Sequence, residues 1–286
     1  MTTITDTIAG AKALTLPIAG RLTAGLRALL RRPTRRPRVP GPAIQSPSFV
    51  GAVGLVLALA AISLVDPLLR HHPGVEDGSI ADRVLTALTS FGEGVEILVG
   101  AALLAIATAS VDPKSVSRRA RAGLAEIGAL AGFAFAAVAG SGLLAAVVKN
   151  LYGRARPEHL AGDGVFELHA LAFRAKFASF PSGHSTTAGA TAVVLAFLFP
   201  GQARLILGLG VGVALTRILL DAHFPSDVIA GLTLGAVFTL ILAHLLARRG
   251  RVFGRDAGGG LVLRPLARPA TWFDTLAAVL GVSRPR

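Results

Sequence analysis

Three short polar clusters interrupt an otherwise apolar chain, and each lies at the end of an apolar segment. They are Lys149 with Arg156-Pro157, then Pro181-Ser182-Gly183-His184, then Arg217 with His223 and Asp227. Together the clusters supply three cations, two imidazoles and one carboxylate. These are the groups needed to hold a phosphate, attack it and protonate its leaving group. The set therefore predicts phosphoryl-transfer chemistry.

Lys149, Arg156 and Arg217 are the predicted phosphate-binding cations. A guanidinium binds two phosphate oxygens at once, whereas an ammonium adds a point charge. Cations at helix ends also commonly anchor a helix at the membrane surface. Arg217 has a second alternative, because Asp221 is four residues on, the spacing of a helical ion pair. We expect phosphate contact, with Asp221 as an orienting neighbour.

The run Pro181-Ser182-Gly183-His184 immediately precedes an apolar segment and predicts a helix N-terminus. Ser182 is a typical N-cap, which is the alternative to a functional role. Free backbone N–H groups at a helix start also bind anions, and Gly183 lets a phosphate approach closely. Ser182 and Gly183 are thus predicted to bind phosphate, and His184 to protonate the leaving oxygen.

His223 and Asp227 flank Phe224-Pro225-Ser226, which predicts a break between two helices. A carboxylate that accepts one ring N–H fixes the imidazole tautomer and leaves the other nitrogen free to attack. His223 is then the predicted nucleophile and Asp227 its orienter. The alternative is an interfacial histidine, with Asp227 only favouring the start of the next helix.

Two histidines and one carboxylate also resemble a metal triad. Metal-dependent phosphoryl chemistry usually employs more carboxylates, and three neighbouring cations would repel the ion. We therefore expect neither a metal nor any other cofactor.

The composition predicts that these clusters are positioned by membrane helices. The chain is 52% hydrophobic and 16% charged, with a mean hydropathy of +0.64, whereas about a quarter of residues are charged in soluble proteins. Apolar runs long enough to cross a bilayer occur at Phe49–Leu69, Phe91–Val111, Leu124–Val148, Gly183–Phe199, Ala203–Leu220 and Val228–Ala247. The expected fold is an all-α bundle of six transmembrane helices.

Basic residues give this bundle an orientation. Of the 29 Lys and Arg residues, 21 fall in alternate connections: eight in 1–48, four in 112–123, one at 204 and eight in 248–286. By the positive-inside rule both termini are cytoplasmic, and all three clusters share the extracytoplasmic face. The net charge of +13 is thereby explained without a nucleic acid partner. The absence of cysteine fits a bacterial inner membrane.

Three regions follow from these patterns: a basic cytoplasmic segment 1–48, a membrane domain 49–247 and a basic cytoplasmic tail 248–286. Within the domain, Asn150–Phe180 is a long connection with Phe166, Phe173, Phe177 and Phe180 at helix-like intervals. It either dips into the headgroup layer beside the site or packs as a lid. Glycine pairs at four-residue spacing predict close helix packing at Gly128 and Gly132, Gly208 and Gly212, and Gly231 and Gly235.

The combined spacing resembles that of the type 2 phosphatidic acid phosphatase (PAP2) superfamily, which shares its site with vanadium haloperoxidases. The shared pattern is Lys, six residues, Arg-Pro; then Pro-Ser-Gly-His; then Arg, five residues, His, three residues, Asp. Thr216 departs from it, because the family usually has Ser before the Arg. The resemblance implies a metal-independent lipid phosphatase with a phosphohistidine at His223. The substrate candidates that this resemblance implies are phosphatidic acid, phosphatidylglycerol phosphate, undecaprenyl pyrophosphate and lipid A phosphate.

Two other functions stay open from the sequence. The phosphohistidine could pass its group to a second lipid, or the chain could be a non-catalytic transporter or scaffold. The second is disfavoured because every chemical role is filled. A haloperoxidase is disfavoured by the membrane spans, since the resemblance assigns that activity to soluble relatives.

Overall fold

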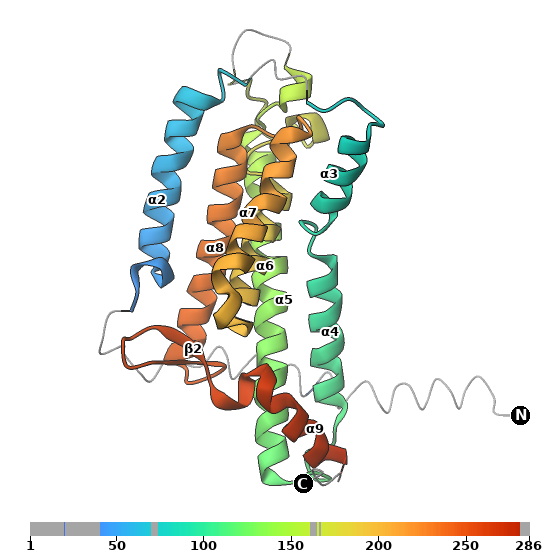
Figure 1. Ribbon diagram of the computed structural model, residues 1–286, viewed down its shortest axis with the longest axis vertical. Coiled ribbons are helices and arrows are strands. Elements are labelled where there is room, and N and C mark those ends of the chain that lie inside the picture. Colours follow the sequence, from blue (N-terminus) through green and yellow to red (C-terminus); the bar gives the residue numbers. More distant parts are fainter. Residues whose placement is uncertain (1–19, 21–40, 70–73, 161–164, 166, 281–286) are drawn as a thin grey trace, which may run out of the picture.

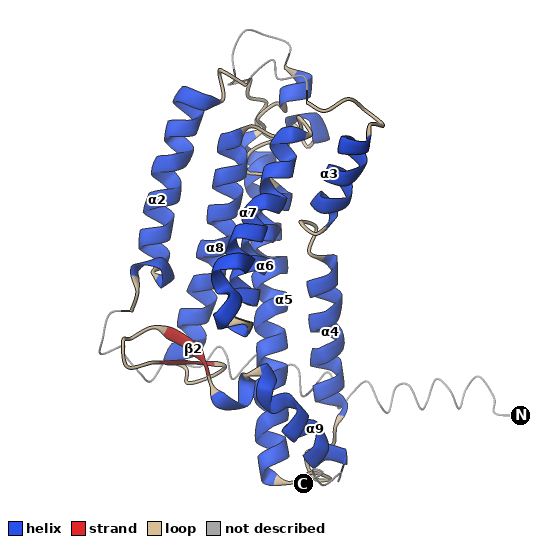
Figure 2. Ribbon diagram, viewed as in Figure 1, coloured by secondary structure: helices blue, strands red, loops and turns tan. Residues whose placement is uncertain are grey.

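Long helices running side by side dominate the computed structural model, which describes residues 20, 41–69, 74–160, 165 and 167–280 (Figures 1 and 2). The predicted basic segment 1–48 therefore lies largely outside the described residues, and Phe166 lies wholly outside them. The main helices are α2 (Pro47–Ala60, continued by a π-helical turn over Ala61–Val65), α3 (Ile80–Ser90), α4 (Val95–Ser110), α5 (Arg118–Tyr152), α6 (Gly183–Leu198), α7 (Ala203–Leu219), α8 (Pro225–Arg248) and α9 (Trp272–Leu280).

Among the described residues, five helical segments are long and apolar enough to cross a membrane. They are Pro47–Val65, Ile80–Ser110, Arg118–Tyr152, Pro200–Leu219 and Pro225–Arg248. The sixth expected span is the exception, because α6 has only 16 residues and reaches about 24 Å, against a hydrocarbon core of about 30 Å. The prediction of six spans is thus confirmed for five. A serine cap at one end of α6 and Pro200 after the other keep this helix short.

The second span differs from its prediction, because α3 and α4 are separated by a break at residues 91–94. Gly94 caps α4 with a φ of 70°, a left-handed conformation that favours glycine. A Cβ there would also collide with the Thr187 side chain on α6. The break therefore presses against α6 and brings Glu93 toward the start of that helix.

Helix α6 is the centre of the bundle and packs on α8, α7 and α5. Gly231 of α8 allows the closest approach, since a Cβ there would lie 2.5 Å from the Ser182 carbonyl oxygen; Gly235 faces Thr186 in the same way. The packing prediction is right for this pair. It is wrong for Gly132, Gly208 and Gly212, which have no described atom within 4 Å of an added Cβ, since these glycines face away from the described helices.

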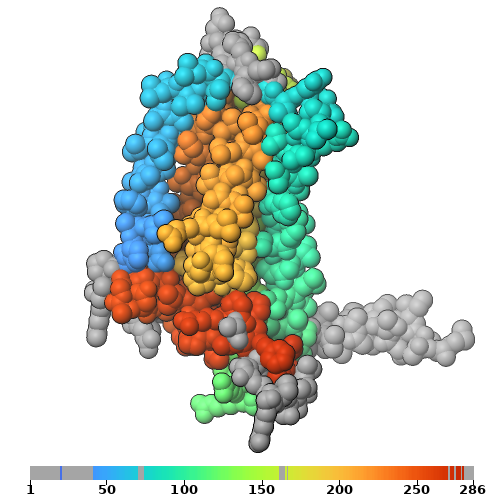
Figure 3. Space-filling view, viewed as in Figure 1, coloured from blue at the N-terminus to red at the C-terminus, as the bar shows by residue number. Residues whose placement is uncertain are grey.

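The bundle is all-α, as predicted, and the tail after α8 adds one short hairpin that the sequence did not predict. Strands β1 (Phe253–Arg255) and β2 (Leu261–Leu263) pair antiparallel, with Phe253 opposite Leu263. Phe253 is fully buried and meets the rings of Phe133 and Phe197 at centroid distances of 4.9 Å. Figure 3 shows the tail in red across one end of the bundle, where it extends the hydrophobic core.

Candidate active site

The three predicted clusters meet at the other end of the bundle, where α5 and α7 end and α6 and α8 begin. The Ser182 N–H donates to the Asp227 carbonyl oxygen over 3.0 Å, which joins the starts of α6 and α8. The His223 N–H donates to the Arg217 carbonyl oxygen over 3.2 Å. Lys149 Nζ lies 3.0 Å from the point where a Gly183 Cβ would stand. The structure thus brings the three predicted clusters together at one end of the bundle.

Two of the cations present nitrogen atoms that the protein itself does not use. The Nε atoms of Arg156 and Arg217 are buried and have no hydrogen-bond partner within the described part of the chain. A buried N–H without an acceptor is costly, and a phosphate oxygen is a suitable acceptor for a guanidinium. The alternative for Arg217 was an ion pair with Asp221 within one helix. The two residues do not share a helix, because α7 ends at Leu219 and Asp221 lies in the following turn with a φ of 52°.

Ser182 caps α6, as the alternative interpretation expected. Its Oγ accepts hydrogen bonds from the Ser185 N–H (3.3 Å) and the Ser185 hydroxyl (2.9 Å), so its own hydrogen remains to be donated. His184 follows on the first turn with a third of its side chain exposed, and its Nε2 lies 3.8 Å from Glu93 Oε1. Lys149, Arg156 and Arg217 are near enough for their charges to act on its ring. His184 therefore lies beside the cationic cluster with part of its side chain exposed.

His223 is almost fully buried, and Ser179 connects it to Asp227. The Ser179 hydroxyl donates to Asp227 Oδ2 over 2.6 Å and lies 3.3 Å from His223 Nδ1. The direct distance from Nδ1 to Asp227 Oδ2 is 3.7 Å. Because Ser179 has one hydrogen and gives it to the carboxylate, a hydrogen bond between Ser179 and Nδ1 requires the ring proton on Nδ1. The other ring nitrogen, Nε2, then has a free lone pair.

The surroundings of His223 also determine its charge state. This residue lies between the spanning helices α7 and α8. Burial lowers its pKa below the ordinary value of 6.5, and Arg156 and Arg217 act in the same direction, while Asp227 opposes them. The ring is therefore neutral at neutral pH, the form in which an imidazole can act as a nucleophile.

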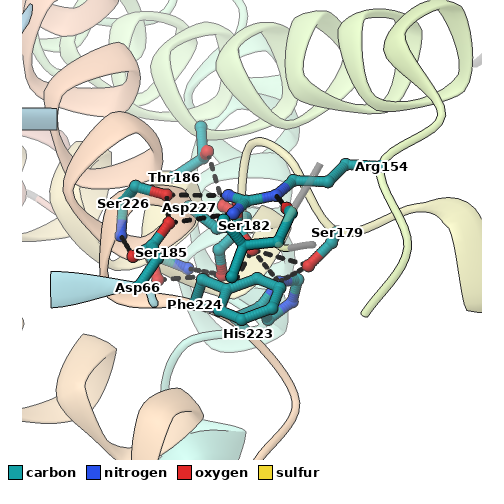
Figure 4. A network of polar contacts seen from close by, with 11 residues as sticks. Asp66, Arg154, Ser179, Ser182, Ser185, Thr186, His223, Phe224, Ser226 and Asp227 are labelled. Atoms are coloured by element: carbon teal, nitrogen blue, oxygen red, sulfur yellow. Dashed lines mark hydrogen bonds and ion pairs between the residues drawn. The ribbon is translucent and has the colours of Figure 1, made fainter. Parts of the chain in front are cut away.

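Three residues that the sequence analysis did not select hold Asp227 in place: Ser179, Arg154 and Asp66 (Figure 4). Arg154 lies between Lys149 and Arg156, in the connection after α5. Asp66 lies near the end of the first apolar run, Phe49–Leu69, directly after the π-helical turn of α2. Each is buried, and an ionisable group at the end of a membrane helix is a recognisable functional signal. That rule could have found Asp66, whereas nothing local marks Ser179.

The structure also shows the surroundings of Thr216 and of the phenylalanines in Asn150–Phe180. The Thr216 hydroxyl donates to the Val213 carbonyl oxygen of its own helix. Among the described residues around the phenylalanines of Asn150–Phe180, the helix-like spacing corresponds to a short 3-10 turn at Ala175–Phe177 and to no longer helix. Phe177 is buried there against the His169 ring, and Phe173 is 73% exposed. The connection thus has one packed side and one exposed apolar side.

Comparisons with known proteins agree with the pattern of the site. A family model described as the PAP2 superfamily matches residues 130–251. A lipid A 1-phosphatase of Rhizobium etli is 37% identical over 200 residues, covering 70% of this chain and 86% of the relative. One from Rhizobium johnstonii is 36% identical over 183 residues, covering 64% and 75%.

Two further similarities are weaker. A decaprenylphosphoryl-5-phosphoribose phosphatase of Mycolicibacterium smegmatis is 33% identical over 174 residues, covering 60% of this chain and 79% of the relative. Among solved structures, a transmembrane PAP2 type phosphatidylglycerolphosphate phosphatase from Bacillus subtilis aligns with a TM-score of 0.47 and 21% identity, covering 69% and 94%.

Proposed function

The chain belongs to the PAP2 superfamily, and from this premise we propose that it hydrolyses a lipid phosphate monoester or pyrophosphate without a metal, through a phosphohistidine. The enzyme is an integral membrane lipid phosphatase. The observation that carries the mechanism is the buried His223, whose Nδ1 lies toward Ser179 and Asp227, beside two guanidinium groups whose Nε atoms have no hydrogen-bond partner among the described residues.

In the first step His223 Nε2 attacks phosphorus and forms a P–N bond. The bond from phosphorus to the lipid oxygen breaks, and its electron pair takes a proton that His184 donates. Lys149, Arg156 and Arg217 bind the phosphoryl oxygens, with help from Ser182 and the Gly183 backbone, as the charge on those oxygens shifts. Asp227 stabilises the positive charge that the His223 ring acquires.

In the second step water attacks the phosphohistidine. His184, now neutral, accepts a proton from the water, the P–N bond breaks, and its electron pair returns to His223 Nε2. Inorganic phosphate leaves, and both histidines recover their starting states. Each step is balanced by groups within the site.

We take lipid A phosphate as the first substrate to test, because the two Rhizobium relatives are named for that activity. Decaprenylphosphoryl-5-phosphoribose is the second, since a more distant relative is named for it. The panel also includes phosphatidic acid, phosphatidylglycerol phosphate and undecaprenyl pyrophosphate, so that monoesters and pyrophosphates with different lipids are compared.

The decisive measurement is phosphate release by the detergent-purified protein in the presence of EDTA. Wild type should release phosphate from at least one lipid, and His223→Ala should be inactive. His244→Ala is the matched control, because this histidine lies on α8 near its far end and contacts Gln45 and Arg255. Brief quenching with a ³²P-labelled substrate should leave an acid-labile label on wild type and none on His223→Ala.

Other results would favour the rival functions. A labelled second lipid without free phosphate would identify a phosphotransferase. Binding of lipid without either product would identify a transporter or scaffold. Loss of release in EDTA, restored by a divalent metal, would refute the metal-free mechanism.

We also propose that the site faces the extracytoplasmic side. Since the chain has no cysteine, single cysteines report its orientation cleanly. In intact cells a membrane-impermeant thiol reagent should label Asp77→Cys, an exposed position in the connection before α3, which contacts the end of α7 beside the site. It should spare Lys114→Cys, an exposed position in the connection between α4 and α5 at the other end of the bundle. The reverse labelling would invert the topology.

A further inference from the structure

We propose that Asp66 and Arg154 are positioning residues for this reaction: they hold Asp227 and set the charge around it, so that one negative charge remains to stabilise phosphorylated His223. This inference rests on the proposed function. It assigns a role to the first spanning segment, because Asp66 directly follows the π-helical turn of α2 and lies outside residues 130–251 that the family model matches.

Arg154 connects two carboxylates that are far apart in the sequence. Its Nη1 lies 2.6 Å from Asp227 Oδ1, and its Nη2 lies 2.9 Å from Asp66 Oδ2. The side chains of all three residues are at most 1% exposed. Nε donates to the Val165 carbonyl oxygen over 3.1 Å, and the guanidinium lies 4.3 Å from the centre of the Phe224 ring. The guanidinium is thus fixed from several sides.

Ser226 connects Asp66 directly to the start of α8. Its N–H donates to Asp66 Oδ1 over 3.1 Å, and its hydroxyl donates to Asp66 Oδ2 while accepting from Arg154 Nη1 over 2.7 Å. Because Ser226 precedes Asp227 in the chain, these bonds fix the backbone that carries the orienting carboxylate. Figure 4 shows the continuous network from Asp66 through Arg154 and Asp227 to His223.

The charges in this network explain why two carboxylates are present. One guanidinium and one carboxylate would be neutral together, and Arg154 would cancel the influence of Asp227 on His223. With Asp66 the three side chains carry a net charge of −1. When His223 attacks phosphorus its ring becomes positive, and the network of four side chains becomes neutral. Asp66 therefore preserves the charge that the intermediate needs, in a buried place where unbalanced charge is costly.

The remaining charged groups around His223 are the same before and after a change at Asp66. Arg156 from the connection after α5 and Arg217 from α7 act on the His223 ring. The titratable His184 from α6 and Lys149 from α5 lie in the same site, and Glu93 and Glu158 act on Arg217. A shift in the titration of His223 in an Asp66 or Arg154 variant therefore reports the network itself.

The test is the ring titration of His223, measured by NMR with ¹⁵N-labelled histidine in detergent and assigned with His223→Gln. Asp66→Asn removes a negative charge, so protonation becomes harder and the pKa should fall. Arg154→Gln removes a positive charge, so the pKa should rise. The double variant restores the net charge of −1, and its pKa should return toward that of wild type. A structural role alone predicts no such opposite shifts.

Turnover gives the second readout. Asp66→Asn should lower kcat by about 10- to 100-fold, the loss typical when a residue that holds a metal-site ligand in place is removed, with a smaller change in KM. Asp82→Asn is the control, because this aspartate in α3 caps its own helix start and contacts Gly78 and Thr86. It should leave both kcat and the His223 titration unchanged.

Every result is decisive. Unshifted or parallel titrations in the two single variants overturn the inference, whatever their stability. If Asp66→Asn alone does not fold, the comparison of wild type, Arg154→Gln and the double variant still tests the predicted direction of the His223 pKa shifts. Wild type that is inactive on every lipid refutes the proposed function. An active wild type with unshifted variants refutes only this inference.

Discussion

At the scale of single residues, the site separates groups that face the substrate from groups that face the protein. His184 is partly exposed, and the unused Nε atoms belong to Arg156 and Arg217. His223 has its Nδ1 turned toward Ser179 and Asp227. The candidate catalytic residues were all selected from the sequence, because their types and spacing carry the chemistry. Ser179 was missed, because a serine before Phe-Pro has no distinctive spacing.

The lowered pKa of His223 gives a prediction at this scale. A histidine whose pKa is lowered stays neutral to lower pH, so the nucleophile is retained below pH 6.5 and is lost only on further acidification. The acid limb of kcat/KM should therefore have its midpoint below pH 6.5. The measurement is a pH profile corrected for the titration of the substrate phosphate, obtained separately by ³¹P NMR. A midpoint above 6.5 would show that Asp227 outweighs burial and the two arginines.

At the scale of elements, the contact between α6 and α8 positions the site. Gly231 and Gly235 let α8 approach α6 closely, and Ser182 at the start of α6 bonds to the Asp227 backbone at the start of α8. Small residues at four-residue spacing predicted this contact. Gly208 and Gly212 in α7 have the same spacing, but no described atom lies within 4 Å of a Cβ added at either position. The spacing shows where a close approach is sterically allowed, and only the arrangement of neighbours decides whether it occurs.

Gly231→Ala tests this contact. The added Cβ would lie 2.5 Å from the Ser182 carbonyl oxygen and 3.0 Å from Ser185 Cβ, so α8 must move. We expect a loss of about 1–3 kcal/mol of stability, measured by thermal unfolding in detergent, together with reduced kcat. Gly212→Ala is the control, since no described atom lies within 4 Å of its added Cβ. Equal effects of the two variants would contradict the role of the contact.

At the scale of the whole molecule, the two ends of the bundle have different tasks. One end holds the charged site. The other is closed by the β1–β2 hairpin, whose start is tied to α5 by the Val252 N–H donating to Glu126 Oε2 over 2.8 Å. The tail was expected only as a basic segment, yet Phe253 and Leu263 belong to the main hydrophobic core. The hairpin therefore contributes to the stability of the bundle, far from the site.

Phe253→Ala tests this division of tasks. Removal of a fully buried phenylalanine costs about 3–5 kcal/mol, so the unfolding temperature in detergent should fall clearly. Because the hairpin closes the end away from the site, kcat/KM per folded molecule should stay near that of wild type. Phe273→Ala is the matched control, since that side chain is 63% exposed and should change neither quantity. A selective loss of kcat/KM in Phe253→Ala would instead connect the tail to the site.

The amino-acid sequence by itself determined the membrane class of the protein, the residue types of its site and the helix ends that carry them. Hydropathy and motif spacing are local properties, so they can be read without a fold. Only the tertiary structure decided which buried groups support Asp227. Arg154 and Asp66 are 88 residues apart, and Asp66 and Ser226 are 160 apart. Such contacts form because helix packing brings distant segments together, and no local spacing encodes that.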